Sequence, residues 1–166
     1  MDLYLLRHAI AETLEDAGVE LDADRPLSPD GKHKMVKIAG TFSTLGVQVD
    51  RVLTSPFKRA RDTAEIAAKA LKTECEILPA LAAGKPTMKV IAELATRQAK
   101  NDAIMIVGHE PDFSRLISML LSGSADLQIT MKKAGLCKLR VERFTPGNFA
   151  TLEWLLTPKQ MLAIAS

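Results

Sequence analysis

Short apolar runs alternate along the chain with longer stretches in which apolar residues recur every three or four positions. The runs are rich in Leu, Ile and Val and predict six strands, at Asp2–Arg7, Arg51–Thr54, Glu74–Leu78, Ala103–Val107, Leu136–Glu142 and Thr151–Leu155. Between the strands, helical spacing over 35–45 and over 113–121 predicts helices that end at Gly46 and Gly123. This alternation predicts an α/β fold, a single three-layer α/β/α domain with a mostly parallel mixed central sheet. Antiparallel strands are expected near the end of the chain, where the helices become sparse.

Proline residues mark where the expected helices begin. Four of them open with proline at the first helical position, at Ser28-Pro29, Ser55-Pro56, Glu110-Pro111 and Thr157-Pro158. In three of the four, a Ser or Thr stands before the proline and can cap the helix. These positions therefore predict where each turn ends and the following helix begins.

Length and charge exclude several classes of protein. The chain has 166 residues, which predicts one domain over 1–166, and its 47% apolar and 25% charged residues are typical of a globular domain. The net charge of +2 is small and no block of five Lys or Arg occurs, so we expect no nucleic-acid partner. No apolar stretch approaches the roughly 18 residues that span a bilayer, and the chain opens into a strand instead of a signal peptide. We therefore expect a cytoplasmic monomer without a membrane partner.

The two cysteines, Cys75 and Cys137, lie far apart in the sequence, without CxxC spacing or a neighbouring histidine. This pattern does not support a zinc or redox site, and we expect two buried thiols. No clustered Asp/His set suggests another metal site.

Cationic and imidazole side chains follow three of the predicted strands. Arg7 and His8 end the first strand, Arg59 follows the second, and His109 follows the fourth. Neighbouring parallel strands bring their carboxyl ends to one crevice, so we expect these side chains to converge. Two guanidiniums, two imidazoles and nearby helix N-termini would bind a compact dianion such as a phosphoryl group.

The chain resembles the histidine phosphatase superfamily, and within it the small bacterial SixA-type protein-histidine phosphatases. The resemblance rests on motifs in the correct order and runs nearly end to end: Arg7-His8, Arg25-Pro26-Leu27-Ser28 with Gly31, Ser55-Pro56-Phe57-Lys58-Arg59-Ala60 with Asp62-Thr63-Ala64, and Gly108-His109-Glu110-Pro111. One such motif is weak evidence, whereas four in order are strong. The resemblance implies a phosphoglycerate mutase-like fold.

The resemblance also implies site roles. His8 would be the nucleophile that forms a phosphohistidine intermediate, with its other ring nitrogen held by a partner such as a backbone carbonyl. Arg7, Arg59 and His109 would bind the phosphoryl oxygens and stabilise the transition state. No metal or other cofactor is expected, because side chains supply the positive charge.

The chain departs from the family pattern at two places. Ala9 replaces the usual glycine, so we expect ordinary negative φ there. Related mutases and phosphomonoesterases carry a carboxylic acid soon after the third strand, whereas Pro79–Gly84 contains none. General-acid help is worth roughly 10²–10⁴ in rate and matters most for a poor alkoxide leaving group. Its absence favours phosphohistidine as the substrate, and the single helix that fits between Pro79 and Ala103 leaves no room for a lid, which suits a phosphorylated protein partner.

Six acidic residues lie between Glu12 and Asp24 without a Lys or Arg among them. A solvated loop explains such a stretch in most proteins, but its place after Arg7-His8 leaves open that one carboxylate touches the site. Glu12, Asp16, Arg25 and Lys58 are therefore candidates for the rim.

Two alternatives remain open. The substrate could be a small phosphomonoester or a nucleotide, with Glu12, Asp16 or Glu93 supplying the proton. Alternatively, the chain could be a non-catalytic module that binds phosphate or a phosphoprotein, a reading disfavoured because Arg7, His8, Arg59 and His109 are all present.

Overall fold

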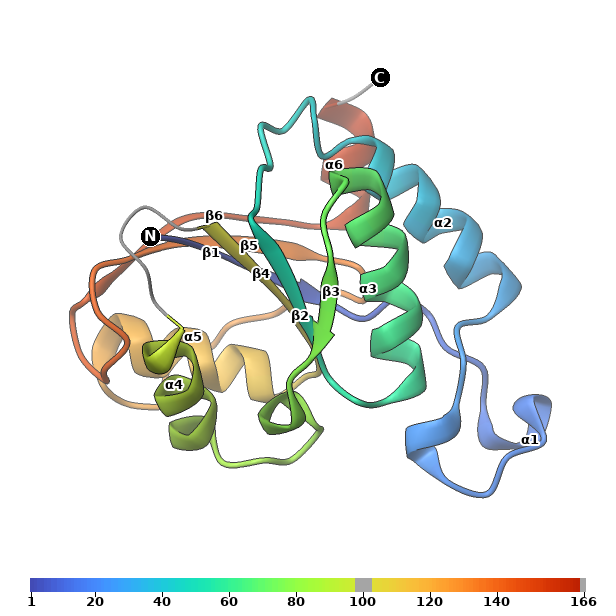
Figure 1. The fold of residues 1–166 in the computed structure, drawn as a ribbon, viewed down its shortest axis with the longest axis horizontal. Coiled ribbons are helices and arrows are strands. Elements are labelled where there is room, and N and C mark those ends of the chain that lie inside the picture. The colour runs from blue at the N-terminus through green and yellow to red at the C-terminus, as the bar shows by residue number, and fades with distance from the viewer. Residues whose placement is uncertain (98–102, 165–166) are drawn as a thin grey trace.

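A computed structural model, which describes residues 1–97 and 103–164, contains one six-stranded mixed sheet (Figure 1). The strands lie in the order β3-β2-β4-β1-β5-β6. Their bounds are β1 Asp2–Arg7, β2 Arg51–Thr54, β3 Cys75–Ile77, β4 Ala103–Gly108, β5 Leu136–Val141 and β6 Ala150–Leu156. The first four strands are parallel to one another, and β5 and β6 continue the sheet antiparallel. The predicted fold class is confirmed.

Helices cover both faces of the sheet (Figure 1). The α-helices are α1 Leu14–Ala17, α2 Pro29–Gly40, α3 Lys58–Leu71, α4 Thr87–Thr96, α5 Asp112–Ser122 and α6 Pro158–Ile164, and two 3₁₀ turns occur at η1 Asp22–Asp24 and η2 Pro79–Leu81. Successive side chains of β1 point to opposite faces of the sheet and contribute to both cores. Leu3 and Leu5 pack with α4 and α5, whereas Tyr4 and Leu6 pack with α2, α3 and α6. None of the described helices is long and apolar enough to span a bilayer.

Two predicted helix starts are wrong. α3 begins at Lys58, so Pro56 lies in the turn before it, where Ser55 Oγ accepts a hydrogen bond from the Phe57 backbone N–H at 3.2 Å. α5 begins at Asp112, with Pro111 at its N-cap position, and the Glu110–Pro111 peptide bond is cis. In both places, a turn and not the helix itself holds the side chains that follow the end of the strand.

The other helix boundaries follow local chemistry more closely. Ser28 caps α2 by accepting from the Gly31 N–H, and α5 ends at Gly123 with a φ of 81°, both as predicted. The helix expected over 35–45 ends earlier, at Gly40, and Gly46 lies beyond it in a left-handed turn with a φ of 67°. Cys75 is exposed and not buried, because β3 is the edge strand of the sheet.

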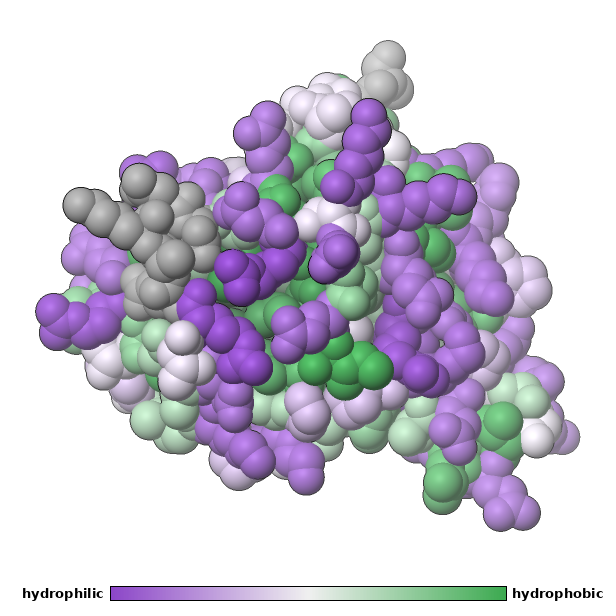
Figure 2. Space-filling model, viewed as in Figure 1, coloured by the Kyte–Doolittle hydropathy of each residue, from purple (hydrophilic) through white to green (hydrophobic). Residues whose placement is uncertain are grey.

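The segment between β1 and α2 projects from the body of the domain (Figure 1). It contains α1 and η1, neither of which buries a residue. Leu14 and Leu21 are exposed here, and the space-filling view shows apolar surface over this projection (Figure 2). α1 and η1 therefore draw little stability from the two cores, whereas Ala9 and Leu27, near the two ends of the segment, pack in one of them.

Close approach of two backbones makes Gly31 a stability determinant of α2. A Cβ at Gly31 would lie 2.0 Å from the Ile10 carbonyl oxygen, whereas one at Gly40 in the same helix would meet nothing within 4 Å. We expect Gly31→Ala to lower the free energy of unfolding by about 1–3 kcal/mol through overpacking. Gly40→Ala should raise it by up to about 1 kcal/mol through helix propensity. Urea denaturation measures both, and equal effects of the two substitutions would contradict the assignment.

Candidate active site

Strand register brings three side chains to one level of the sheet edge. Arg7 in β1 pairs with Gly108 in β4, and Thr54 in β2 pairs with Val107. The next residues continue this pairing, since the His8 N–H donates to the Gly108 carbonyl at 3.0 Å and the Ser55 N–H donates to the Val107 carbonyl at 2.9 Å. His8, Ser55 and His109 consequently leave the sheet side by side.

His8 is buried, with only 7% of its surface exposed, and its two ring nitrogens have different partners. Nδ1 lies 2.7 Å from the Ala9 carbonyl oxygen, which can only accept, so Nδ1 carries the proton. Nε2 then has a free lone pair, which accepts from the Arg59 Nε–H at 3.3 Å. Burial lowers the pKa of His8 to about 4, and the charges of Arg59 and Arg7 add to this effect. A neutral imidazole with its Nε2 lone pair facing the cations is a nitrogen nucleophile.

His109 lies beside His8, with ring centroids 5.2 Å apart. Its Nε2 is 2.7 Å from Ser55 Oγ, which also accepts a hydrogen bond from the Phe57 N–H. Its Nδ1 is buried and has no partner among residues 1–97 and 103–164. Burial lowers the pKa of His109 to about 3, with His8 and Arg59 adding to the effect. The ring is thus neutral, and in the tautomer in which the Ser55 hydroxyl donates to Nε2, its Nδ1–H is an unused donor.

Arg59, in the first turn of α3, is fixed by the projecting acidic segment. Its Nη1 donates to the Asp22 carbonyl at 2.7 Å and its Nη2 to Asp22 Oδ2 at 2.9 Å. Arg25 Nε donates to Asp22 Oδ1 at 2.8 Å and holds the carboxylate in place. Burial raises the pKa of Asp22, but the hydrogen bonds and charges of the two arginines outweigh it and leave that pKa lowered. One carboxylate of the acidic stretch therefore does reach the site.

Arg7 has a carboxylate neighbour of its own. Its Nη1 donates to the Met131 carbonyl at 2.6 Å, and the charge of Glu110 acts on its guanidinium. Glu110 Oε2 accepts from Ser114 Oγ at 2.5 Å, and burial raises the pKa of this carboxyl group. Arg7 Nε and Glu110 Oε1 are both buried without a hydrogen-bond partner in the described part of the chain. Buried polar atoms without partners are rare, and these two belong to the residues that directly precede His8 and follow His109 in the sequence.

Thr63 links the backbone next to His8 to helix α3. Its Oγ1 accepts from the Ala9 N–H at 3.0 Å and donates to the Arg59 carbonyl at 2.7 Å. Ala9 does not adopt positive φ, which agrees with the expectation for a residue with a methyl side chain.

The four predicted rim residues differ in what they touch. Arg25 binds Asp22, and Lys58 pairs along α3 with Asp62, whose other oxygen accepts from the Leu27 N–H at 3.2 Å. Asp16 bonds to Thr13 at the start of α1, and the Glu12 carbonyl accepts from Arg25 Nη1 at 2.8 Å. Arg25 is thus the rim candidate that supports the site through Asp22.

The predicted proton donors lie in other places. Asp16 accepts from the hydroxyl of Thr13, the N-cap of α1, and Glu93 pairs with Arg97 along α4 at 2.6 Å. In the described residues, no side-chain hydrogen bond joins Glu12, Asp16 or Glu93 to the four site residues. Sequence reasoning missed Glu110 and the Ser55–His109 hydrogen bond, and it did not select Asp22 from the six acidic residues of the stretch. The position of Glu110 directly after His109 was a signal for that residue.

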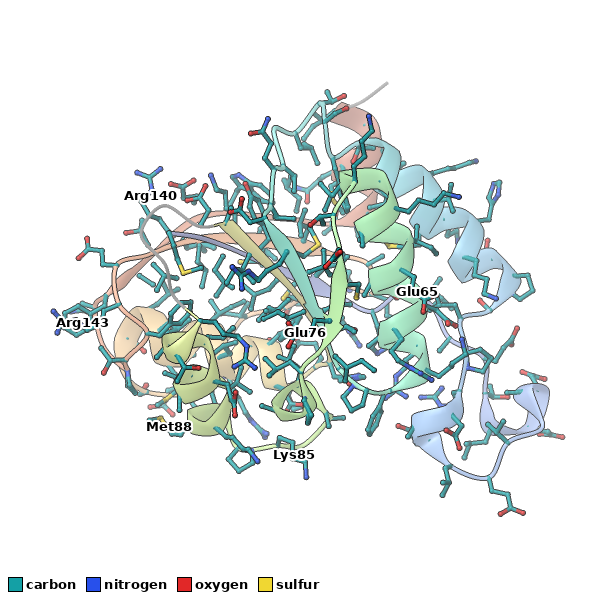
Figure 3. All side chains as sticks on the ribbon, in the orientation of Figure 1. Glu65, Glu76, Lys85, Met88, Arg140 and Arg143 are labelled. Atoms are coloured by element: carbon teal, nitrogen blue, oxygen red, sulfur yellow. The ribbon has the colours of Figure 1, made fainter. Side chains whose placement is uncertain are left out.

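The turn after β3 forms one wall beside His109. Ala80, Leu81 and Ala82 face His109 and Phe113 across a small cavity of about 10 Å³. The turn contains no acid of its own, but Asp112 approaches from α5 and accepts from the Gly84 N–H at 2.9 Å. Lys85, after this turn, points outward (Figure 3). Of residues 79–97, only η2 and α4 are helical, and 98–102 lie outside the described residues.

No group of three or more potential metal ligands occurs in the described residues. The site instead concentrates two guanidiniums and two neutral imidazoles around unpartnered donors. Such an arrangement can bind a tetrahedral oxyanion and present a lone pair to its central atom.

Known proteins are similar to this chain in sequence and in architecture. Residues 3–83 match the model of the histidine phosphatase superfamily, branch 1. The chain is 35% identical to an uncharacterised protein of Picosynechococcus sp., over 98% of this chain and 99% of that protein. It is 25% identical to the phosphohistidine phosphatase SixA of Escherichia coli, over 95% and 94%.

Solved structures show the same fold. A structure of the protein histidine phosphatase SixA complexed with tungstate superposes with a TM-score of 0.80 at 23% identity, covering 96% of this chain and 98% of that one. A phosphoserine phosphatase of Entamoeba histolytica in complex with 3-phosphoglyceric acid gives a TM-score of 0.73 at 17% identity, covering 96% and 98%. The architecture is therefore that of the phosphoglycerate mutase-like fold.

The lowered pKa of His8 makes stability depend on pH. An unfolded histidine takes up a proton near pH 6.5, whereas folded His8 resists protonation until about pH 4, so the unfolded state binds more protons between these values. Stability from this group is therefore lost as the pH falls from 6.5 towards 4. Between pH 7 and pH 5, we expect wild-type protein to lose about 2 kcal/mol more unfolding free energy than His8→Asn. Urea titrations at both pH values measure this, and equal losses would show that His8 titrates normally.

Proposed function

The chain belongs to the histidine phosphatase superfamily, and we propose that it hydrolyses phosphohistidine on another protein without a metal ion. The observation that carries the proposal is the neutral His8, with its Nε2 lone pair directed at Arg59, together with Arg7 Nε and His109 Nδ1, which have no partner in the described part of the chain. This geometry supplies a nucleophile and oxyanion donors at one point.

Phosphoryl transfer to His8 would begin with replacement of a hydrogen bond. The Arg59 Nε–H, which donates to His8 Nε2, shifts to a phosphoryl oxygen and frees the lone pair. Nε2 then attacks phosphorus in line, forming an N–P bond while the bond from phosphorus to the leaving nitrogen breaks and that nitrogen keeps the electron pair. The other nitrogen of the departing ring takes up a proton from solvent, so the ring leaves as neutral imidazole. Arg7, Arg59 and the His109 Nδ1–H bind the equatorial oxygens, where charge is spread in the transition state. The Ala9 carbonyl stabilises the imidazolium-like His8 through its Nδ1–H.

The second step returns the enzyme to its starting state. A water oxygen attacks phosphorus opposite Nε2, the N–P bond breaks, and Nε2 recovers its lone pair. The water proton leaves with inorganic phosphate or passes to solvent. His8 is again neutral, because burial and the neighbouring arginines disfavour its protonated form.

The leaving group distinguishes the possible substrates. The turn from Pro79 to Gly84 has no carboxylic acid, and Asp112, the carboxylate that approaches it, is engaged by the Gly84 N–H. A phosphohistidine nitrogen leaves much more easily than an alkoxide and needs less acid help. The similarity to SixA of Escherichia coli supports the same choice.

A second candidate is hydrolysis of a small phosphate ester, and Glu110 favours it. This carboxyl group is half-buried, its pKa is raised by burial, and its Oε1 has no hydrogen-bond partner in the described residues. In this role, a protonated Glu110 would donate to the departing alkoxide. The fold shared with a phosphoserine phosphatase is compatible with this candidate.

Turnover of two substrates tests the proposal. We expect a protein phosphorylated on histidine to be hydrolysed with a kcat/KM at least about tenfold above that of the alkyl ester O-phosphoserine, because the alkoxide of this ester demands general-acid help. His8→Asn should lower turnover by at least about 10³ and abolish the acid-labile phosphoenzyme. His33→Asn, at an exposed position of α2, is the control. A clear preference for the ester, lost in Glu110→Gln, would support the second candidate, and no turnover of either substrate would identify a binding module.

Asp22 should act as a positioning residue for Arg59. We expect Asp22→Asn to lower kcat/KM about tenfold or more, because Arg59 Nη2 loses its charged carboxylate partner and only the backbone carbonyl bond of Nη1 is unchanged. Asp24→Asn changes an exposed acid in the same 3₁₀ turn and should have little effect. The effect should fall on kcat more than on the thermal midpoint, since α1 and η1 bury no residue. Equal kinetics for the two variants would show that Arg59 needs no support from Asp22.

A further inference from the structure

A second cavity lies on the same edge of the sheet as the phosphoryl site, and nothing above assigns it a role. It has a volume of about 420 Å³ and lies between α2, α6 and the segment before β5. We call it the lysine-rimmed pocket, defined by Ala9, Ile38, Leu162, Lys34, Lys133 and Lys159. Its volume falls in the range of ligand-binding pockets, roughly 300–1,000 Å³.

Strand topology places this pocket next to His8. β6 runs parallel to β1 because both are antiparallel to β5, and Leu156 at its end pairs with Leu136, which pairs with Leu6. α6 therefore starts at the carboxyl edge of the sheet. Ala9 directly follows His8, and the Ala134 N–H, on the other wall of the pocket, donates to the His8 carbonyl at 3.2 Å. The His8–Ala9 backbone thus separates the pocket from the phosphoryl site.

The pocket combines an apolar floor with a basic rim. Ala9, Ile38 and Leu162 supply apolar surface below, whereas the three lysines are exposed around the opening. Lys34 pairs with Asp30 on its own helix at 2.8 Å. Lys133 and Lys159 have no ion-pair partner in the part of the chain that the structure describes. Lys133 is close enough to the nucleophile for its charge to act on His8.

Charge is distributed unequally around the phosphoryl site. The acidic segment approaches from the side of Arg59 through Asp22, whereas the lysine-rimmed pocket lies on the side of Ala9. A partner with acidic residues is attracted by the lysines and repelled by the acidic segment. The two sides together favour one orientation of such a partner.

We propose that the lysine-rimmed pocket docks an acidic segment of the phosphorylated protein substrate, with one apolar side chain of that segment on the floor and its carboxylates at Lys133 and Lys159. This inference rests on the proposed function. A ligand that occupies both places must pass over the His8–Ala9 backbone, which suits a peptide chain with a phosphohistidine and a second anchoring side chain. A small phosphate ester would occupy the phosphoryl site without reaching the lysine-rimmed pocket.

Synthetic peptides provide the test. Each peptide carries one histidine that is phosphorylated with phosphoramidate. The residues next to this histidine are two Glu and one Leu in the first peptide, two Gln and one Leu in the second, and two Glu and one Ala in the third. Each flank is placed on either side of the histidine. For wild-type protein, we expect the acidic Leu peptide in one orientation to have a kcat/KM about tenfold above both others, mainly through KM. The advantage of Glu over Gln should shrink as salt rises.

Reversing the charge of a single lysine tests whether the preference for acidic peptides arises at the lysine-rimmed pocket. Lys159→Glu should reduce the preference for Glu over Gln peptides about tenfold, whereas Lys69→Glu, at the far end of α3, should leave that preference unchanged. Equal kcat/KM for all three peptides with wild-type protein, or an unchanged preference in Lys159→Glu, would overturn the pocket assignment while phosphohistidine hydrolysis stands. No hydrolysis of any peptide, with p-nitrophenyl phosphate still turned over, would overturn the proposed function and the docking inference with it.

Discussion

Parallel pairing of β1, β4 and β2 is the constraint on which the site depends. Backbone hydrogen bonds from His8 to Gly108 and from Ser55 to Val107 continue the ladder one residue beyond the strands. A shift of one residue in either pairing would turn each side chain to the opposite face. The fully buried central strands prevent such a shift, because it would exchange the two apolar cores of the sheet. Packing far from the site therefore sets the distance between its imidazoles.

Electrostatic balance is the second feature of the site. Burial makes both histidines neutral, and each arginine has an acidic neighbour, Asp22 for Arg59 and Glu110 for Arg7. The carboxylates offset the cost of bringing two guanidiniums together, while the Arg59 Nε–H faces His8 and Arg7 Nε has no partner in the described residues. The site is close to neutral overall yet rich in donors, which favours an anion without burying uncompensated charge.

The sequence predicted the strand ends and the convergence of Arg7, His8, Arg59 and His109, because apolar runs and the parallel arrangement determine where such residues emerge. It could not select Asp22 from six acidic residues, since that choice depends on how a segment without periodicity returns to α3. The hydroxyl of Ser55 had a local explanation as a helix cap, which hid its bond to His109. The exposure of Cys75 depends on the position of β3 at the sheet edge, a property of strand order that local sequence does not encode.

The projecting segment that carries Asp22 has a consequence for how the protein loses activity. α1 and η1 bury no residue, so this segment opens at a lower free energy than the two cores. When it opens, Arg59 loses its fixed orientation although the sheet and its helices are intact. Mild denaturant or a protease cut in this projection would thus yield a folded protein with greatly reduced activity, and the active form is less stable than the fold that supports it.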